Sequence, residues 1–245
     1  MSAFYNGFIF NPLYNILIGL FTFIPWIDAG VAVIILTVIV RLVLFPLSKK
    51  AVLTQVRMQS INPELKIIKE KYKDKEEQAR KTLELYKEKG VNPFSGVLVL
   101  LIQLPIIFAL YRIFLHAGFP NVDTALLYSF VPSPAHINVF FLGLIDITKK
   151  SAPLALLAAG STYFQLKLAS SNTNKPDKKG DKASFGEDLA QSMQTQMKYF
   201  FPILVFFISY KISGVIALYW LTSNLFTIGQ EIVVRKKITL DQKTV

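Results

Sequence analysis

The stretch that decides the fold is YFFPILVFFISYKISGVIALYWLTSNLFTIGQEIVV, residues 199–234, in which apolar side chains continue with few charges between them. As one helix it would be about 54 Å long, far more than the roughly 30 Å hydrocarbon core of a bilayer. The segment therefore has to cross twice, and Lys211, Ser213 and Gly214 mark the expected turn. It predicts two membrane spans, at residues 195–211 and 212–235.

Three other apolar stretches are each long enough to cross a bilayer once. They predict spans at residues 27–48, 94–115 and 151–169, which makes five in total. The composition agrees, because 52% of the 245 residues are hydrophobic and only 18% are charged, whereas a soluble domain carries about a quarter charged residues. The predicted fold is an all-α integral membrane protein with five transmembrane helices.

The basic residues set the expected orientation, because Lys and Arg accumulate on the cytoplasmic side of membrane proteins. Of 27 such residues, 22 lie in three blocks, at residues 49–93, at 167–198 and after 234. Five spans place all three blocks in the cytoplasm if the N-terminus is outside and the C-terminus inside. The remaining segments follow from this order: a cytoplasmic helical hairpin (49–93), an extracytoplasmic loop (116–150), a flexible cytoplasmic loop (170–194) and a cytoplasmic tail (236–245).

Residues 1–26 are apolar but are interrupted by Asn, Pro and Tyr side chains. We expect an N-terminal interfacial helix on the outer leaflet, with a sixth span as the alternative. Residues 1–23 hold no Lys or Arg, so they lack the basic region of a signal peptide and are expected to belong to the mature protein.

The hairpin has its own start and stop signals. Asn62 is expected to cap a helix that has Pro63 at its first position, and Gly90, followed by Asn92 and Pro93, is expected to end the hairpin. Its apolar residues recur at helical spacing and are expected to pack against the preceding helix through Leu53 and Val56. This stripe consists of Leu65, Ile68, Tyr72, Ala79, Leu83 and Tyr86.

Residues suited to enzyme chemistry are scarce. The chain has no cysteine and only two histidines, which excludes a disulfide framework, a thiolate zinc site and a cysteine nucleophile. It also has no phosphate-binding glycine loop and no paired acidic residues within a predicted span. We therefore expect no enzyme activity, no metal and no cofactor. The net charge of +11 lies mainly in the blocks beside the membrane, so we expect no direct specificity for nucleic acid.

Arg41 is the polar residue that most needs a partner, because an arginine inside a span costs about 2.5–3.5 kcal/mol on insertion scales. Its side chain could extend to the cytoplasmic surface, or it could face a wet interior with polar groups of other spans. Alternatively, the polar groups of the other spans could serve only to hold neighbouring helices together. They include Thr222 and Ser223, and the candidate groove residues are Arg41, Thr37, Gln103, Gln165, Tyr219, Trp220 and Asn224.

Several short motifs together resemble the YidC/Oxa family of membrane protein insertases. They are Asn11-Pro12-Leu13-Tyr14-Asn15, Arg41-Leu42-Val43-Leu44-Phe45-Pro46-Leu47, Met58-Gln59 with Asn62-Pro63-Glu64, Leu85-Tyr86-Lys87, Val91-Asn92-Pro93, Gln103-Leu104-Pro105 with Ala109-Leu110-Tyr111, and Leu218-Tyr219-Trp220 with Ser223-Asn224. The resemblance implies five spans around a hydrophilic groove that is closed to the outside, with Arg41 as its positive charge and Gln165 and Trp220 as further groove residues. It also implies that the hairpin recruits substrate, ribosome or Sec translocon.

The resulting interpretation is an insertase of the bacterial cytoplasmic (plasma) membrane that works without nucleotide hydrolysis. Its partners would be nascent membrane proteins and the lipid bilayer. The alternative is a small transporter or channel with an anionic substrate site at Arg41, and a third possibility is a purely structural partner protein. The first two functions differ in whether the cavity is closed on the outer side, as an insertase groove is expected to be.

Overall fold

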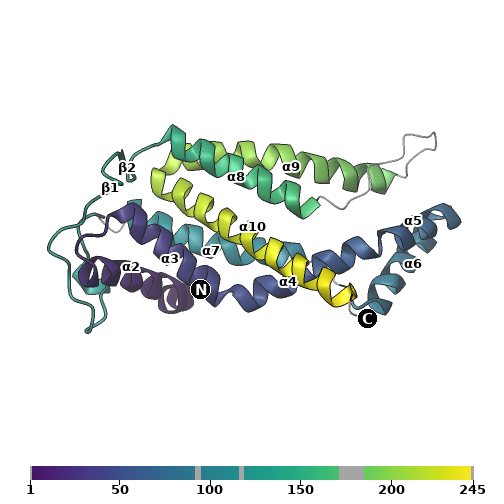
Figure 1. Ribbon diagram of the computed structural model, residues 1–245, viewed down its shortest axis with the longest axis horizontal. Helices are drawn as coiled ribbons and strands as arrows, with labels where there is room; N and C mark the ends of the chain where they lie inside the picture. Colours follow the sequence, from purple (N-terminus) through teal and green to yellow (C-terminus); the bar gives the residue numbers. More distant parts are fainter. Residues whose placement is uncertain (1, 92–94, 116–118, 171–184, 244–245) are drawn as a thin grey trace.

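The computed structural model describes residues 2–91, 95–115, 119–170 and 185–243, and these are mostly helical (Figure 1). The helices and short strands follow one another in the order α1 (Ser2–Tyr5), the π-helix η1 (Asn6–Phe10), α2 (Asn11–Phe23), α3 (Ala29–Val43), α4 (Phe45–Ser60), α5 (Asn62–Lys71), α6 (Lys75–Glu88), α7 (Ser95–Leu115), the 3-10 helix η2 (Thr124–Leu126), β1 (Phe140–Phe141), β2 (Ile145–Asp146), α8 (Ala152–Ser170), α9 (Phe185–Ile212) and α10 (Gly214–Lys243).

Helix α10 is the central element of an elongated bundle. It packs against α8 and α9 on one side and against α3 and α7 on the other (Figure 1). Helices α5 and α6 project at one end of the bundle, and β1, β2 and the long loop before α8 lie at the opposite end. The hydrophobic core joins α2, α3, α7 and α10, and its fully buried side chains include Leu17, Val33, Ile113 and Ile216.

The predicted first span is a bent pair of helices. Helices α3 and α4 meet at Leu44 with an angle of 64° between them, and α4 then continues without a break to Ser60. The predicted boundary at residue 48 therefore falls inside α4. Within the described ranges no single helix has the length and apolar character of a membrane span, whereas the pair Ala29–Val43 and Phe45–Met58 has both when taken together. The number of spans stays a prediction.

The predicted turn near the C-terminus is confirmed, since α9 ends at Ile212 and α10 begins at Gly214. Gly214 lies against the backbone of Ile147, where a Cβ atom would come within 3.1 Å of its Cα. Both helices extend further than the predicted spans, because α9 begins at Phe185 and α10 continues to Lys243. Most of the predicted flexible loop, residues 171–184, lies outside the described residues.

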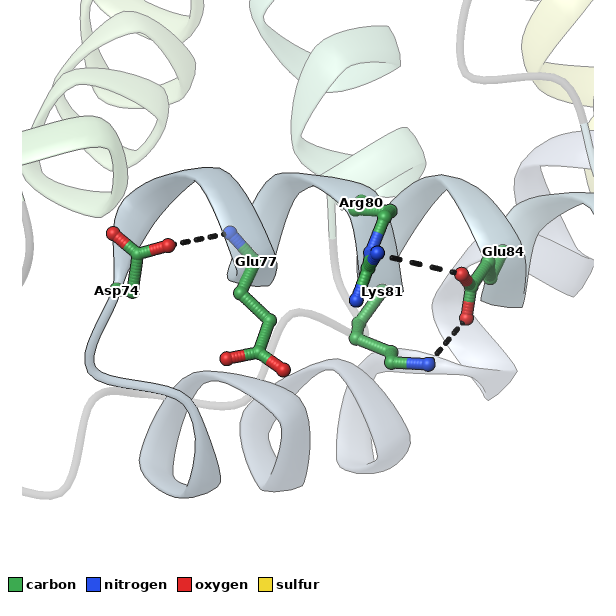
Figure 2. Close-up of polar contacts among 5 residues, drawn as sticks. All are labelled: Asp74, Glu77, Arg80, Lys81 and Glu84. Carbon is green, nitrogen blue, oxygen red and sulfur yellow. Dashed lines mark hydrogen bonds and ion pairs between the residues drawn. The ribbon is translucent and has the colours of Figure 1, made fainter.

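The hairpin consists of α5 and α6, which contact one another after a break at Tyr72. The expected cap is wrong: Asn62 is already the first helical residue, and Ile61 precedes it without a side-chain cap. The actual side-chain cap is on α6, where Asp74 accepts a hydrogen bond from the backbone N–H of Glu77 at 3.0 Å (Figure 2). The end at Gly90 is confirmed by its positive φ of 62°. Asn92 and Pro93 lie outside the described residues.

The predicted apolar stripe of the hairpin is confirmed in part, since Leu65, Ile68 and Tyr86 pack against a small cluster of buried side chains. Leu85 is buried with Ile61 and Val91 in this separate cluster, to which Met58 adds a side chain from the end of α4. Leu83, which the spacing placed in the stripe, is exposed. The reason is the break between α5 and α6, because a continuous helical period does not apply across two helices. Figure 2 shows polar contacts along α6, where Lys81 contacts Glu84 at 2.7 Å.

The N-terminal helices bind the long loop through buried polar groups. Asn15 donates to the carbonyl of Leu126 at 2.9 Å and accepts from the N–H of Tyr128 at 2.7 Å. The hydroxyl of Tyr14 accepts from the N–H of Asp123 at 2.8 Å. These side chains therefore fix the loop to α2, whereas the sequence suggested only that they interrupt an apolar helix. The depth of α2 in a membrane stays a prediction.

Candidate functional site

A hydrogen-bonded cluster joins the middle of the bundle around Arg41. The Nε of Arg41 donates to the hydroxyl oxygen of Ser223 at 2.8 Å, and Nη2 donates to Oε1 of Gln103 at 3.1 Å while also contacting Ser223. These residues come from α3, α10 and α7. The guanidinium of Arg41 therefore points between α7 and α10. Its planar fork of N–H donors can reach acceptors on both helices at once.

Gln103 connects this arginine to a tyrosine. Its amide oxygen accepts from Arg41, and its amide Nε2 donates to the hydroxyl of Tyr219. Tyr219 and Ser223 are buried and stand four residues apart on α10, so both hydroxyls lie on one face of the helix. Sequence reasoning placed Ser223 among the polar groups of this span but not among the candidate site residues, although it is the nearest partner of Arg41.

The partners of Arg41 are all uncharged. No ion pair joins its guanidinium to a carboxylate among the residues that the structure describes. Arginine stays protonated in proteins, so the cluster solvates a cation without neutralising it. A carboxylate brought into this region would gain a charge-assisted hydrogen bond that neutral groups cannot supply.

The other candidate residues do not all belong to this cluster. Thr37 is buried and donates to the carbonyl of Val33 in its own helix at 2.6 Å. Asn224 donates to Ser161 at 3.0 Å and to Thr162 at 2.7 Å. It therefore joins α10 to α8, on a different side of α10 from Ser223.

The two remaining candidates, Gln165 and Trp220, are half-buried. Trp220 packs against the main core. Within the described part of the chain, no hydrogen bond links Gln165 to Arg41. Of the candidate residues, Arg41, Gln103 and Tyr219 form one hydrogen-bonded cluster, whereas Asn224 contacts α8.

An apolar hollow of about 410 Å³ lies between α3, α8 and α10, and Val38 in its wall stands one turn before Arg41 on α3. Apart from Thr222, its walls are hydrophobic side chains, so it suits a hydrocarbon chain or the apolar face of a helix. The lining residues are Ile34, Val38, Phe141, Leu154, Leu157, Leu218, Leu221, Thr222, Leu225 and Phe226.

The loop before α8 covers the end of the bundle that lies away from the hairpin. Asp28 caps α3 through the N–H of Val31 at 2.9 Å, and the N–H of Ala29 donates to the carbonyl of Asn138 at 2.7 Å. Phe141 packs against Gly30, where even one added Cβ atom would come within 2.2 Å of the ring. These contacts anchor the loop on the first turn of α3.

The same loop also contacts the turn between α9 and α10. The N–H groups of Gly214 and Val215 donate to the carbonyls of Lys149 at 2.8 Å and Ile147 at 2.9 Å. The first turn of α10 thereby finds acceptors for N–H groups that a helix start leaves free. Loop contacts therefore cover the starts of α3 and α10 at one end of the bundle.

Comparison with known proteins identifies the family. The sequence model of the family described as "60Kd inner membrane protein" matches residues 19–242, which is most of the chain. The chain belongs to this family. A relative from Fusobacterium nucleatum, named "Membrane protein insertase YidC", is 32% identical over 209 residues, covering 85% of this chain and 86% of the relative. The resemblance to YidC/Oxa insertases expected from the motifs is confirmed.

Other relatives of the 60Kd inner membrane protein family carry the same name. One from Clostridium tetani is 32% identical over 220 residues, covering 89% of this chain and 86% of the relative. One from Pelobacter propionicus is 30% identical over 85% of this chain but only 35% of its own length, so the match lies within a longer protein. The family description places its members in the inner membrane, in agreement with the expected bacterial membrane location.

Proposed function

We propose that this protein is a membrane protein insertase that helps nascent membrane proteins enter the bilayer. The observation that carries the proposal is the protonated Arg41, held between α3, α7 and α10 by the neutral side chains of Gln103 and Ser223. Membership of a family whose relatives are named insertases supports the same function.

The proposed mechanism is partial solvation of a polar segment within the membrane. Moving such a segment through hydrocarbon is costly because its backbone and charged groups find no hydrogen-bond partners there. The Arg41 cluster offers hydrogen bonds and a positive charge part of the way across. The hollow between α3, α8 and α10 would hold the adjoining apolar segment, which then leaves sideways into lipid. Such a route forms no covalent bond and requires no nucleotide hydrolysis.

The proposed topology has five spans, with the N-terminus outside and residues 49–93 inside. Because the chain has no native cysteine, single cysteines at Ser2 and Lys73 can be labelled separately with a membrane-impermeant reagent in intact cells and in inverted vesicles. We expect Ser2→Cys to react only from outside and Lys73→Cys only from inside. Labelling of both from the same side would contradict the topology.

The hairpin is the proposed recruiting surface for the ribosome or the Sec translocon. Helix α6 presents charged side chains such as Arg80, Lys81 and Glu84, which contact one another along its surface (Figure 2). Ion pairs of this exposed kind contribute little to stability, so their residues are available for a partner at low cost to the fold.

The alternative of a small transporter with an anionic site at Arg41 receives less support. A transporter needs access from both sides of the membrane, whereas loop contacts cover the starts of α3 and α10. Site-specific crosslinking separates the two functions. A photoreactive residue at Val38, in the hollow beside Arg41, should crosslink to a membrane protein chain stalled on a ribosome. A matched probe at the exposed Phe207 of α9, which does not line the hollow, controls for nonspecific proximity. Failure of the Val38 probe to crosslink any of several such chains would contradict the insertase function.

A further inference from the structure

The hairpin of β1 and β2 exposes apolar side chains at its tip. Leu142 and Leu144 are 66% and 81% exposed, and the neighbouring Phe140 is 47% exposed. Single exposed leucines are common on soluble surfaces, but here they flank Gly143 in the tight turn between the strands, in which Leu142 also has a positive φ, of 52°. Gly143 has a positive φ of 72°, which glycine adopts without strain.

The tip is held in place by defined contacts. The two strands pair antiparallel, with Phe140 opposite Asp146. The N–H of Leu142 donates to Asp28 at 3.1 Å, and the ring of Phe141 lies against Gly30 on α3. With the backbone fixed on both sides, the exposed leucines cannot turn inward to the core. Their exposure is therefore a built-in property of this end of the molecule.

The position of the tip relative to the helices indicates what could cover it. The β1–β2 turn adjoins the starts of α3 and α10, and α8 begins shortly after β2. Ends of apolar membrane helices lie at the boundary between hydrocarbon and lipid headgroups, where amphipathic residues concentrate. A group of exposed lysines occurs at the same end: Lys149, which is 78% exposed, with Lys150 and Lys211.

We propose that the β1–β2 tip is a lipid anchor that inserts Leu142 and Leu144 into the outer leaflet of the membrane. Burial of their side chains in hydrocarbon removes apolar surface from water. Lys150 and Lys211 would meet the phosphates of anionic lipids, while Lys149 pairs with Asp146 at 3.1 Å. Because the β1–β2 segment is fixed to α3 and to the start of α10, the anchor would hold this end of both helices at a set depth in the membrane. The inference rests on the proposed membrane-spanning positions of α3, α8 and α10.

The test uses single cysteines in the full-length protein, since the chain has none of its own. Leu144→Cys is labelled with the environment-sensitive dye NBD and reconstituted into vesicles of phosphatidylethanolamine and phosphatidylglycerol. Leu156→Cys on α8, where the side chain is 61% exposed, provides the lipid-facing reference. Lys73→Cys in the exposed loop between α5 and α6 provides the aqueous reference. Quenching by doxyl-labelled lipid and by aqueous iodide is compared for the three probes.

We expect the Leu144 probe to resemble the Leu156 probe, with blue-shifted emission, strong quenching by shallow doxyl lipid and weak quenching by iodide. If it resembles the Lys73 probe while Leu156 behaves as lipid-facing, the anchor is refuted and the spanning helices stand. If Leu156 is also quenched by iodide and not by lipid, the proposed spans fail as well. A Leu144 probe protected from both quenchers would point to a protein partner and would equally overturn the lipid anchor.

Discussion

Substitution of Gly30 by alanine tests how tightly the outer loop is seated on α3. The added Cβ atom would lie 2.2 Å, 2.5 Å and 2.7 Å from the Cδ2, Cγ and Cβ atoms of Phe141, all far below ordinary contact distance. Phe141 must therefore move, and overpacking of this kind costs about 1–3 kcal/mol. Alanine is favoured over glycine in a helix by about 1 kcal/mol, which offsets part of this cost.

The matched control removes the helix contribution. Gly160 lies within α8, and a Cβ atom added there would meet no atom within 4 Å. Gly160→Ala should therefore gain the helix preference without a clash. The difference between the two variants then isolates the clash at about 1–3 kcal/mol. At about 2–4 °C per kcal/mol for a chain of this size, Gly30→Ala should melt several degrees below Gly160→Ala in detergent, as followed by circular dichroism.

A protein that lacks the Phe141 side chain tests whether this contact causes the destabilisation. In a Phe141→Ala protein the clash partner is gone, so Gly30→Ala should become neutral or stabilising there. If Gly30→Ala lowers the melting temperature equally with and without the Phe141 side chain, the destabilisation does not arise from this contact. Equal melting temperatures for Gly30→Ala and Gly160→Ala in the native background would also contradict it.

Two further predictions concern the same end of the molecule. Asn15→Ala should lower the free energy of unfolding by about 2–6 kcal/mol, because it leaves two part-buried backbone groups of the loop unpaired at about 1–3 kcal/mol each. Thermal unfolding of Asn15→Ala beside the wild type would show this, and unchanged unfolding would contradict it. Burial acts to raise the pKa of Asp146, but hydrogen bonds from Thr148 and Lys149 outweigh this and lower the pKa. The stabilisation is therefore complete above the usual carboxyl pKa and lost as pH falls through the lowered one. Asp146→Asn should thus weaken protection of the loop amides in hydrogen exchange at neutral pH and differ less from wild type in acid; an equal difference at both pH values would refute this.

Much of the helical order could be predicted from local sequence. The length of residues 199–234 required a turn, and Ser213 and Gly214 provided it. Gly90 likewise ended the hairpin because it tolerates a positive φ. Such features depend on residues close together in the chain, which is why pattern and turn chemistry were sufficient.

Other features depend on partners far away in the sequence. The role of Ser223 depends on Arg41, 182 positions away, and the division between Ser223 and Asn224 depends on which neighbouring helix each one faces. Tyr14 and Asn15 looked like interruptions of an apolar helix because their loop partners lie more than 100 positions away. Buried polar side chains usually have a hydrogen-bond partner, but the sequence did not identify those partners.

The most direct test of the insertase function is the insertion of a client with an acidic translocated segment by Arg41 variants. We expect Arg41→Ala to fail, while Arg41→Lys retains much of the activity because a charge at this position is what the client needs. Failure of both would instead indicate that the guanidinium fork is required. Arg112→Ala is the control, since that arginine is exposed on α7 and donates to Asn6 at 2.7 Å, away from the cluster. Normal insertion of the acidic client by folded Arg41→Ala protein would contradict the central claim.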